Sequence, residues 1–487
     1  MKPVFLINVR SSFVISGSRK LDYCMKYFSA ARKNIISVLF TLIIFFSVIP
    51  DLNSQSVRHG GKETELAFHA WAPVPPMGWN SWDCFGPTVV EKEVRDNADY
   101  MSQHLREFGW KYIVVDIRWY VENDRAGGYN QDDPHYVMDE YGRFMPAVNR
   151  FPSAAGGNGF KPLADYVHSK GLNFGIHVMR GVPVPAVRKN TPILGTGLKA
   201  GDIYSASDLC RWLSDMYTVD PSKKGAQEYY NSIFQLYASW GVDFVKVDDL
   251  SGRLGEIELI RKAIDNCGRP IVLSISPSGN KIGDEEFLRD HVNMWRTTDD
   301  FWDNWKALKN EFVICNDWEG KAGDGYYPDA DMLPLGRIGI RAERGVPRMS
   351  GFTKDEQRTL MTLFAIFRSP LMFGGNLPDN DQFTLSLITN MEVLKVDQQS
   401  RNNRQIFRNG DIIAWTADDP GTGDKYLALF NASDSEGPVE ISVKLDLIGL
   451  SSNHDVKDIW SGKSIGWVTD IFSMAIARHG AGLYRIH

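Results

Sequence analysis

Two pairs of charged residues lie at the ends of hydrophobic stretches and could carry out acid–base or nucleophilic chemistry. Lys246 lies two residues before Asp248, and Arg296 lies four residues before Asp300. Side chains two apart on a strand share a face, so Lys246 would lie beside Asp248 and keep its carboxylate ionised. Arg296 is close enough in sequence to position Asp300 or to lower its pKa. Two facing carboxylates of this kind suit glycoside hydrolysis, one as nucleophile or base and the other as proton donor.

The stretches around these residues have the pattern of a barrel built from alternating strands and helices. Residues 241–250 form a short apolar run that ends in charge, as a buried parallel strand does. Apolar residues at helical spacing precede this run over 225–240 and follow it at Ile257, Ile260 and Ile264. Helix, strand, acidic end and helix form the unit of a (β/α)8 TIM barrel, in which chemistry lies at the C-terminal strand ends.

The whole chain can be divided on the same basis. We predict the remaining strands within 75–86, 112–119, 172–178, 271–276, 294–299 and 370–373, with the seventh at 312–316 or just before Asp329. The fold class is α/β, with a catalytic barrel over 70–395. From about residue 396 the helical periods stop, and short alternating runs separated by turn signals predict an antiparallel β domain over 396–487.

Composition narrows the class of protein. The chain has 487 residues and a net charge of −6, which gives no reason to expect nucleic acid as a partner. Its five cysteines include no CxxC pair, so the sequence has no zinc or redox motif. The 14 tryptophans and 18 tyrosines could be platforms for sugar rings or part of a large core. The sequence does not indicate an oligomeric state.

The N-terminal residues have the layout of a secretory signal. Lys26, Arg32 and Lys33 precede an apolar stretch over 35–49, and a polar stretch follows. We assign residues 1–54 to a signal peptide and lead-in, with Met25 as a second possible start. An uncleaved anchor is the alternative. We therefore expect export to the periplasm or outside the cell, with no membrane contact beyond this N-terminal signal.

Further polar and aromatic side chains fall at the predicted strand ends and complete a candidate site. They are Trp79, Asp83, Asp116, His177 and Ser276. The candidate residues also have simpler interpretations. The tandem aspartates at 248–249 and 299–300 can be solvated turns, His177 can be a packing residue, and Trp79 or Trp82 can belong to the core. Their joint placement at strand ends favours a site.

A cluster of aspartates permits a different interpretation. Asp324, Asp329 and Asp331 lie close together in sequence. Hard oxygen ligands at alternating positions suit calcium, so these residues could form a calcium loop of a metal-dependent hydrolase.

Five motifs, in this order, resemble those of the α-galactosidase family, glycoside hydrolase family 27. They are Met77–Trp82 (MGWNSW), Lys246–Asp248 (KVD), Trp295–Asp300 (WRTTDD), Asp329–Leu333 (DADML) and Phe367–Met372 (FRSPLM). The resemblance runs from about residue 73 to the C-terminus, and the five motifs together are highly specific.

The resemblance implies a barrel followed by a C-terminal β-sandwich, and hydrolysis with retention through a covalent glycosyl–enzyme. By residue-by-residue match, Asp248 takes the nucleophile position and Asp300 the acid/base position. Sugar-contacting positions fall on Trp79, Asp116, Lys246, Arg296 and Asp331. The resemblance implies no metal and no organic cofactor.

Three positions depart from the family pattern. The second strand usually ends in Asp-Asp, but here Ile117 follows Asp116, so an apolar wall replaces one polar sugar contact. Ser276 stands in a fifth-strand exit that usually reads Cys-Glu-Trp, which leaves the C2 side of the sugar less constrained. Asp249 and Leu250 stand where a Gly-Cys pair is common, so the disulfide usual near the nucleophile is absent.

These observations predict a retaining exo-glycosidase that removes terminal α-D-galactosyl residues from oligo- or polysaccharides. Ile117 opens the alternative of a β-L-arabinopyranosidase, because a sugar without the C6 hydroxymethyl group needs no polar partner there. An α-N-acetylgalactosaminidase and a non-catalytic sugar-binding protein are further alternatives. We count Ile117, His177 and Ser276 among the residues expected to contact the sugar.

Overall fold

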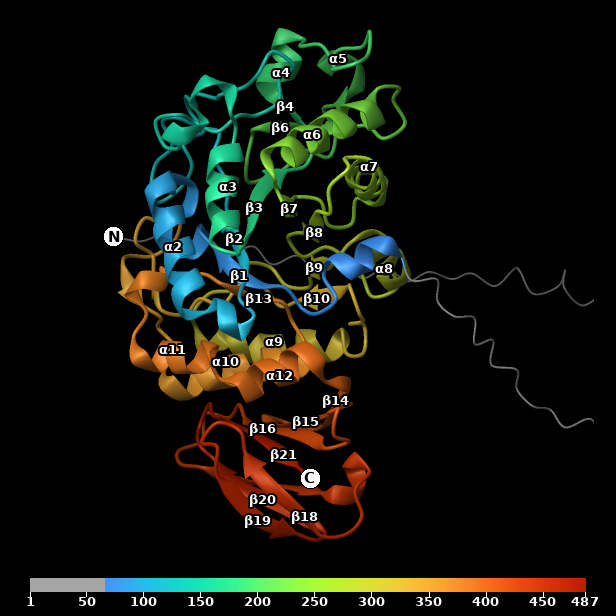
Figure 1. The fold of residues 1–487 in the computed structure, drawn as a ribbon. Helices are drawn as coiled ribbons and strands as arrows, with labels where there is room; N and C mark the ends of the chain where they lie inside the picture. The colour runs from blue at the N-terminus through green and yellow to red at the C-terminus, as the bar shows by residue number, and fades with distance from the viewer. Residues whose placement is uncertain (1–65) are drawn as a thin grey trace, which may run out of the picture. The chain divides into compact units, whose positions relative to one another are not determined.

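Eight short apolar segments pair side by side as parallel strands and form the barrel that the sequence predicts (Figure 1). The computed structural model describes residues 66–487, so the predicted signal segment over 1–54 lies outside the described residues. The strands follow the order β10 (Tyr327–Asp329), β9 (Met294–Arg296), β8 (Val272–Ile275), β7 (Phe244–Asp248), β3 (Asn173–Met179), β2 (Tyr112–Val115), β1 (Met77–Asn80) and β13 (Leu371–Phe373). A parallel bridge between Leu333 and Phe373 joins the two ends of this sheet.

Helices follow the strands and cover the barrel, as their apolar periodicity predicts. The longer ones are α2 (Glu91–His104), α3 (Lys161–Ser169), α6 (Ala226–Trp240), α7 (Leu254–Asp265), α9 (Trp305–Asp317) and α10 (Lys354–Phe367), with the shorter α8 (Glu285–His291). Thr353 and Glu356 form a capping box that starts α10, since each side chain accepts from the other's backbone N–H. Gly241 ends α6 at a φ of 83°, a left-handed conformation that glycine adopts without strain.

The seventh strand differs from one of the two predicted placements. Residues 312–316 lie inside α9, and β10 over Tyr327–Asp329 takes the other predicted place, ending at Asp329 itself. The segment 312–316 is short and apolar, and periodicity alone does not separate a strand from a buried helix turn of that length.

Two long connections rise from the barrel next to the candidate site. The first runs from the end of β2 to α3. The second runs from β3 to α6 and contains α4 (Val184–Lys189), α5 (Ala200–Ile203) and a small sheet in the order β4 (Val182–Pro183), β6 (Met216–Val219) and β5 (Tyr204–Ser205), drawn in green in Figure 1.

The chain changes to antiparallel strands after α11 (Gln382–Ile388) and α12 (Met391–Gln399). One sheet has the order β14 (Arg401–Asn409), β15 (Ile412–Asp418), β16 (Lys425–Asn431), β21 (Ala481–Ile486), β18 (His454–Asp458) and β19 (Ser464–Val468). The second sheet pairs β17 (Val439–Lys444) with β20 (Ile471–Ile476). Their apolar faces enclose a separate core that includes Leu427, Val443 and Phe472.

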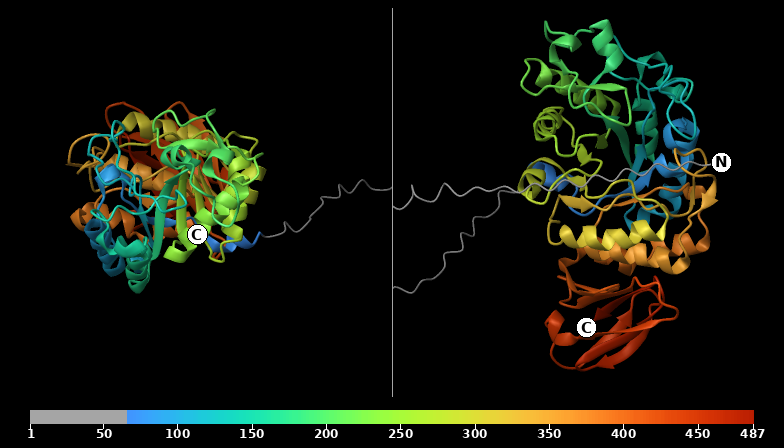
Figure 2. Two further views of the ribbon diagram at one scale, coloured as in Figure 1. Left: turned by 90° about the horizontal axis from the view of Figure 1, so that it is seen from above. Right: turned by 180° about the vertical axis from the view of Figure 1, so that it is seen from behind.

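The β domain packs against the barrel through α10, as the view from behind also shows (Figure 2). Thr359 on α10 donates a hydrogen bond to the carbonyl of His479 at 2.7 Å, and Trp460 donates to the Thr362 hydroxyl at 3.0 Å. Within residues 66–487, no helix is long and apolar enough to cross a membrane. The four cysteines of this part of the chain are free.

Candidate active site

A pocket of about 670 Å³ opens at the C-terminal ends of the barrel strands. It brings together most of the residues that the sequence singles out for chemistry, namely Asp116, Ile117, Lys246, Asp248, Arg296, Asp300 and Asp331. Asp248 is the last residue of β7, Arg296 is the last of β9, and Asp116 follows β2 directly. Strand geometry therefore delivers these groups to one place, as it does in other barrels.

The groups around Asp248 keep its carboxylate ionised. His177 Nε2 lies 3.1 Å from Asp248 Oδ2, and the backbone N–H of Asp249 donates to Oδ1 at 2.8 Å. Burial raises the pKa of Asp248, but the hydrogen bond from His177 and the charges of His177, Lys246 and Arg296 outweigh it and hold the pKa well below its ordinary value. Asp248 is thus a largely shielded anion at neutral pH, the state that a nucleophilic carboxylate requires.

Asp116 and Lys246 form a charged pair beside this carboxylate. Lys246 Nζ lies 3.3 Å from Asp116 Oδ2, which also accepts a hydrogen bond from Asn80 Nδ2 at 2.7 Å. Burial alone would raise the pKa of Asp116. The charges of Lys246 and His177 lower it by more, so the pKa lies below its ordinary value and the carboxylate stays charged. The pair presents one fixed acceptor and one fixed donor to the pocket, which are the groups that bind sugar hydroxyls.

The other carboxylate, Asp300, lies in a more open setting. Arg296 Nη2 contacts Asp300 Oδ1 at 2.9 Å, and Arg296 Nη1 contacts Asp331 Oδ1 at 3.0 Å. The backbone N–H of Phe301 donates to Asp331 Oδ2 at 2.7 Å. The side chain of Asp300 is 44% exposed, against 15% for Asp248. Arg296 therefore orients Asp300 while water still reaches it.

Three predicted sugar contacts lie elsewhere. Trp79 does not face the pocket: it is fully buried in the core, and its Nε1 donates to the carbonyl of Gly375 at 2.8 Å. Ser276 is also fully buried, and its neighbour Pro277 lines the pocket instead. His177 is fully buried behind Asp248, so its role in this structure is to hold that carboxylate.

Trp82, and not the predicted Trp79, lies in the pocket wall. Strand β1 ends at Asn80, and the short helix α1 (Trp82–Phe85) begins two residues later. The change from strand to helix directs Trp82 into the pocket and leaves Trp79 in the core. Both tryptophans belong to the same sequence motif, so no signal in the motif itself separated them.

The aspartate cluster does not form a calcium loop. Asp324 pairs with Arg401 at 2.7 Å, whereas Asp331 pairs with Arg296. Within residues 66–487 no group of three or more His, Cys, Asp or Glu side chains is placed to hold a metal ion.

Two buried carboxyls lie behind the Arg296 side of the site. Burial and the charge of Asp331 raise the pKa of Asp329 to about 7. Burial likewise raises the pKa of Glu311 on α9 to about 8, although a hydrogen bond from Thr298 opposes the shift. Glu311 therefore carries a proton at neutral pH and Asp329 carries one about half of the time, which limits the negative charge around Arg296.

Arg180 pairs with Asp249, one of the two residues that stand where the family usually has a Gly-Cys pair. Arg180 Nη2 lies 2.9 Å from Asp249 Oδ2, and Arg180 Nη1 lies 2.8 Å from Glu256 Oε2. The backbone N–H of Arg180 donates to the carbonyl of Asp248 at 3.1 Å. Tyr230 donates to the second oxygen of Glu256 at 2.6 Å. This buried ionic cluster ties the end of β7 to α7, a connection that sequence reasoning missed because its members are far apart along the chain.

Known proteins resemble this chain in both of its parts. A family model described as alpha galactosidase A matches residues 214–399, and a model of the alpha galactosidase C-terminal beta sandwich domain matches residues 409–486. An alpha-galactosidase of Cyamopsis tetragonoloba is 28% identical over 88% of this chain and 90% of its own length. An alpha-N-acetylgalactosaminidase of Gallus gallus is 26% identical over 85% of this chain and 93% of its own length.

A solved structure is more similar. A family 27 β-L-arabinopyranosidase from Geobacillus stearothermophilus is 51% identical and superposes with a TM-score of 0.84, covering 87% of this chain and 98% of that one. Identity at this level over nearly the whole described chain, with the same barrel and the same C-terminal sandwich, shows the family. The chain therefore belongs to glycoside hydrolase family 27, the α-galactosidase family, and is a glycosidase.

Proposed function

We propose that the enzyme is a retaining exo-glycosidase that removes terminal α-D-galactosyl residues from oligo- or polysaccharides. The observation that carries the proposal is the pairing, in one pocket, of a largely shielded ionised carboxylate, Asp248, with a more exposed one, Asp300. Asp248 attacks the anomeric carbon while Asp300 gives its proton to the departing oxygen, which leaves a covalent glycosyl–enzyme. Asp300 then takes a proton from water as that water displaces Asp248.

Retention is directly testable. Proton NMR of the first product formed should show the anomer with the substrate's configuration, before mutarotation mixes the two. The inverted anomer as first product would overturn the assignment of Asp248 as nucleophile, because a single displacement by water inverts the centre.

A second candidate sugar, a terminal β-L-arabinopyranosyl residue, is favoured by Ile117. This side chain lines the pocket next to Asp116, where the family resemblance places a polar contact. A buried hydroxyl without a partner there would lose on the order of 1–3 kcal/mol. The Geobacillus structure at 51% identity is that of a β-L-arabinopyranosidase, and a second one contains arabinose.

A paired rate comparison separates the two sugars. Nitrophenyl α-D-galactopyranoside and nitrophenyl β-L-arabinopyranoside are compared with the wild type and with Ile117→Asp. Faster galactoside cleavage by the wild type supports the first proposal, and faster arabinoside cleavage supports the second. If Ile117 sets the choice, Ile117→Asp raises the galactoside-to-arabinoside ratio of kcat/KM by about tenfold or more. An unchanged ratio would show that other contacts select the sugar.

We also propose that residues 1–54 direct export. The proposal rests on the basic, apolar and polar order of this segment. Fusing the segment to a reporter that is active only outside the cytoplasm should give reporter activity, and replacing Ile43 and Ile44 by Asp should abolish it. Reporter activity that survives this change would contradict the proposal.

A further inference from the structure

The pocket extends past the two carboxylates into a wall supplied by the two long connections. Gly128, Tyr129 and Gln131 come from the segment after β2, and Trp212 comes from the segment after β3. The three rings of Trp82, Tyr129 and Trp212 lie in a row, with centroids 5.9 Å apart at each step. Trp212 is 36% exposed, so the outermost ring has a free apolar surface.

Direct hydrogen bonds join the two connections at this wall. Gln131 Nε2 donates to the carbonyl of Trp212 at 3.1 Å. The Oε1 of Gln131 accepts from the backbone and hydroxyl of Ser214, at 3.2 and 3.1 Å. The Trp212 segment is therefore fastened to the segment that carries Tyr129.

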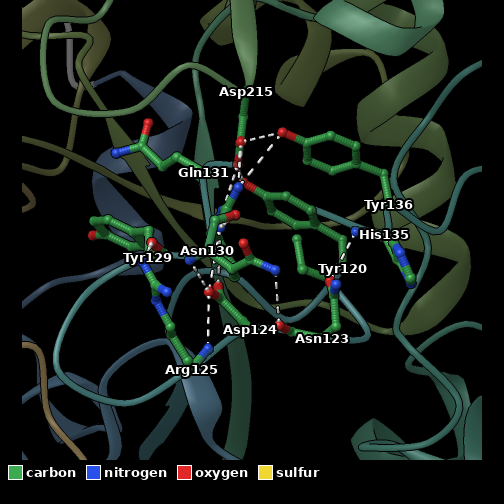
Figure 3. A network of polar contacts seen from close by, with 12 residues as sticks. Tyr120, Asn123, Asp124, Arg125, Tyr129, Asn130, Gln131, His135, Tyr136 and Asp215 are labelled. Carbon is green, nitrogen blue, oxygen red and sulfur yellow. Dashed lines mark hydrogen bonds and ion pairs between the residues drawn. The ribbon is translucent and has the colours of Figure 1, made fainter. Parts of the chain in front are cut away.

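A buried polar network beneath the wall fixes the same two segments (Figure 3). Asp215, which is fully buried, accepts from Arg118 at 2.6 and 2.8 Å, from Tyr120 at 2.7 Å and from Tyr136 at 2.6 Å. Arg118 Nη1 also donates to the carbonyl of Asn130 at 3.1 Å. A satisfied buried network of this kind makes the segments above it rigid, so the rings are held in place before any ligand binds.

The wall continues to the carboxylate that protonates the leaving group. The backbone N–H of Gly127 donates to the carbonyl of Ala342 at 3.0 Å, and Glu343 and Arg344 next to it line the pocket. Arg344 Nη2 lies 3.9 Å from Asp300 Oδ2. Since Asp300 gives its proton to the departing oxygen under the proposed function, this side of the pocket faces the part of the substrate that leaves.

We propose that Tyr129 and Trp212, with Gln131, Glu343 and Arg344, form a binding subsite for a second pyranose ring, the sugar to which the terminal residue is attached. The inference rests on the proposed function. A pyranose has an apolar C–H face that packs on an exposed indole, and ring hydroxyls that hydrogen-bond to amide, carboxylate and guanidinium groups. The wall offers both kinds of group, an exposed ring at Trp212 and polar side chains at Gln131, Glu343 and Arg344.

The test compares a disaccharide with a substrate whose leaving group is a single fluoride, too small to reach the proposed subsite. The two substrates are a glycosyl fluoride and a 1→6-linked disaccharide ending in glucose, both carrying whichever terminal sugar the wild type cleaves faster. For Trp212→Ala, the disaccharide-to-fluoride ratio of kcat/KM should fall about tenfold, which corresponds to ~1.4 kcal/mol of transition-state binding. Trp212→Phe should restore most of the ratio, because a ring remains.

Trp467→Ala is the matched control, since Trp467 is a 74% exposed tryptophan of the C-terminal domain. Its ratio should equal that of the wild type. A Trp212→Ala ratio equal to the wild-type ratio would overturn the subsite, because the fluoride rate in the same preparation corrects for any loss of folded enzyme. If the wild type cleaves neither an α-galactosyl nor a β-L-arabinopyranosyl fluoride, the proposed function itself fails.

Discussion

The two sides of the pocket hold their carboxylates in different ways. Asp248 ends a strand in the middle of the sheet, and a histidine, a lysine and a backbone N–H stabilise its charge. Asp300 lies in the segment after β9, close to half exposed, with Arg296 as its near partner. A nucleophile must be charged and fixed, whereas an acid/base group must exchange its proton with water. The difference in burial supports assigning these two roles in this order.

The largest effect should come from neutralising Asp248, the less exposed of the two carboxylates. Asp248→Asn removes the attacking anion, so kcat should fall by about 10⁴-fold or more. Steady-state rates with a nitrophenyl glycoside measure the loss, and circular dichroism checks that the variant is folded. Full turnover by this variant would contradict the assignment, and any turnover that the change removes excludes a non-catalytic sugar-binding protein.

Neutralising the exposed carboxylate should cost less, and the cost should depend on the leaving group. Asp300→Asn should lower kcat by about 10²–10⁴-fold for a disaccharide, whose departing oxygen needs a proton. Fluoride departs readily without a proton, so the rate of glycosyl fluoride hydrolysis should fall less. Rates for the two substrates provide the comparison, and equal losses on both would argue against Asp300 as the proton donor.

The ionic cluster on the nucleophile side should matter for stability. Arg180→Met removes the buried cation that Asp249 and Glu256 share, and breaking a buried pair in this way costs about 3 kcal/mol in the free energy of unfolding. Urea unfolding of the variant and the wild type measures this loss of stability.

Arg253→Met is the matched control for this change. Arg253 also contacts Asp249, at 3.4 Å, but its side chain is 25% exposed against 2% for Arg180. Arg253→Met should therefore lose less stability than Arg180→Met. An equal loss in the two variants would mean that burial of the cluster is not what makes Arg180 important.

The smallest effect should come from the protonated carboxyl behind the acid/base side. Glu311 has a folded-state pKa of about 8 and an ordinary value near 4.5 when unfolded. The folded chain thus binds one more proton between these values, so the wild type loses stability as pH rises from about 4.5 to about 8. Glu311→Gln has no such proton, so it should gain stability over the wild type with rising pH, by about 2 kcal/mol between pH 5 and pH 6.5.

Thermal unfolding at pH 5, 6.5 and 8 measures this trend. Glu258→Gln, at a 48% exposed carboxylate beside Lys262, is the matched control and should show no such gain. A difference between Glu311→Gln and the wild type that stays constant with pH would show that Glu311 is ionised in the folded protein.

Periodicity along the chain was enough to predict the barrel and part of its site. Lys246 and Asp248 share a strand face because side chains alternate, and Arg296 reaches Asp300 across four residues of one segment. Both relations are local. The seventh strand was harder to place, because the segment 312–316 is too short for its period to distinguish a strand from the helix turn that it forms.

The rest of the site depends on which distant segments come together. The sequence by itself determined the parallel barrel, the antiparallel domain and the charged strand ends, since each follows from the spacing of neighbouring residues. Only the tertiary structure decided that Trp82 and not Trp79 faces the pocket, that Arg180 stabilises the end of β7, and that two long connections meet at Trp212. Contacts between residues tens of positions apart leave no period in the sequence, and they form only when the packed barrel has fixed where each connection begins and ends.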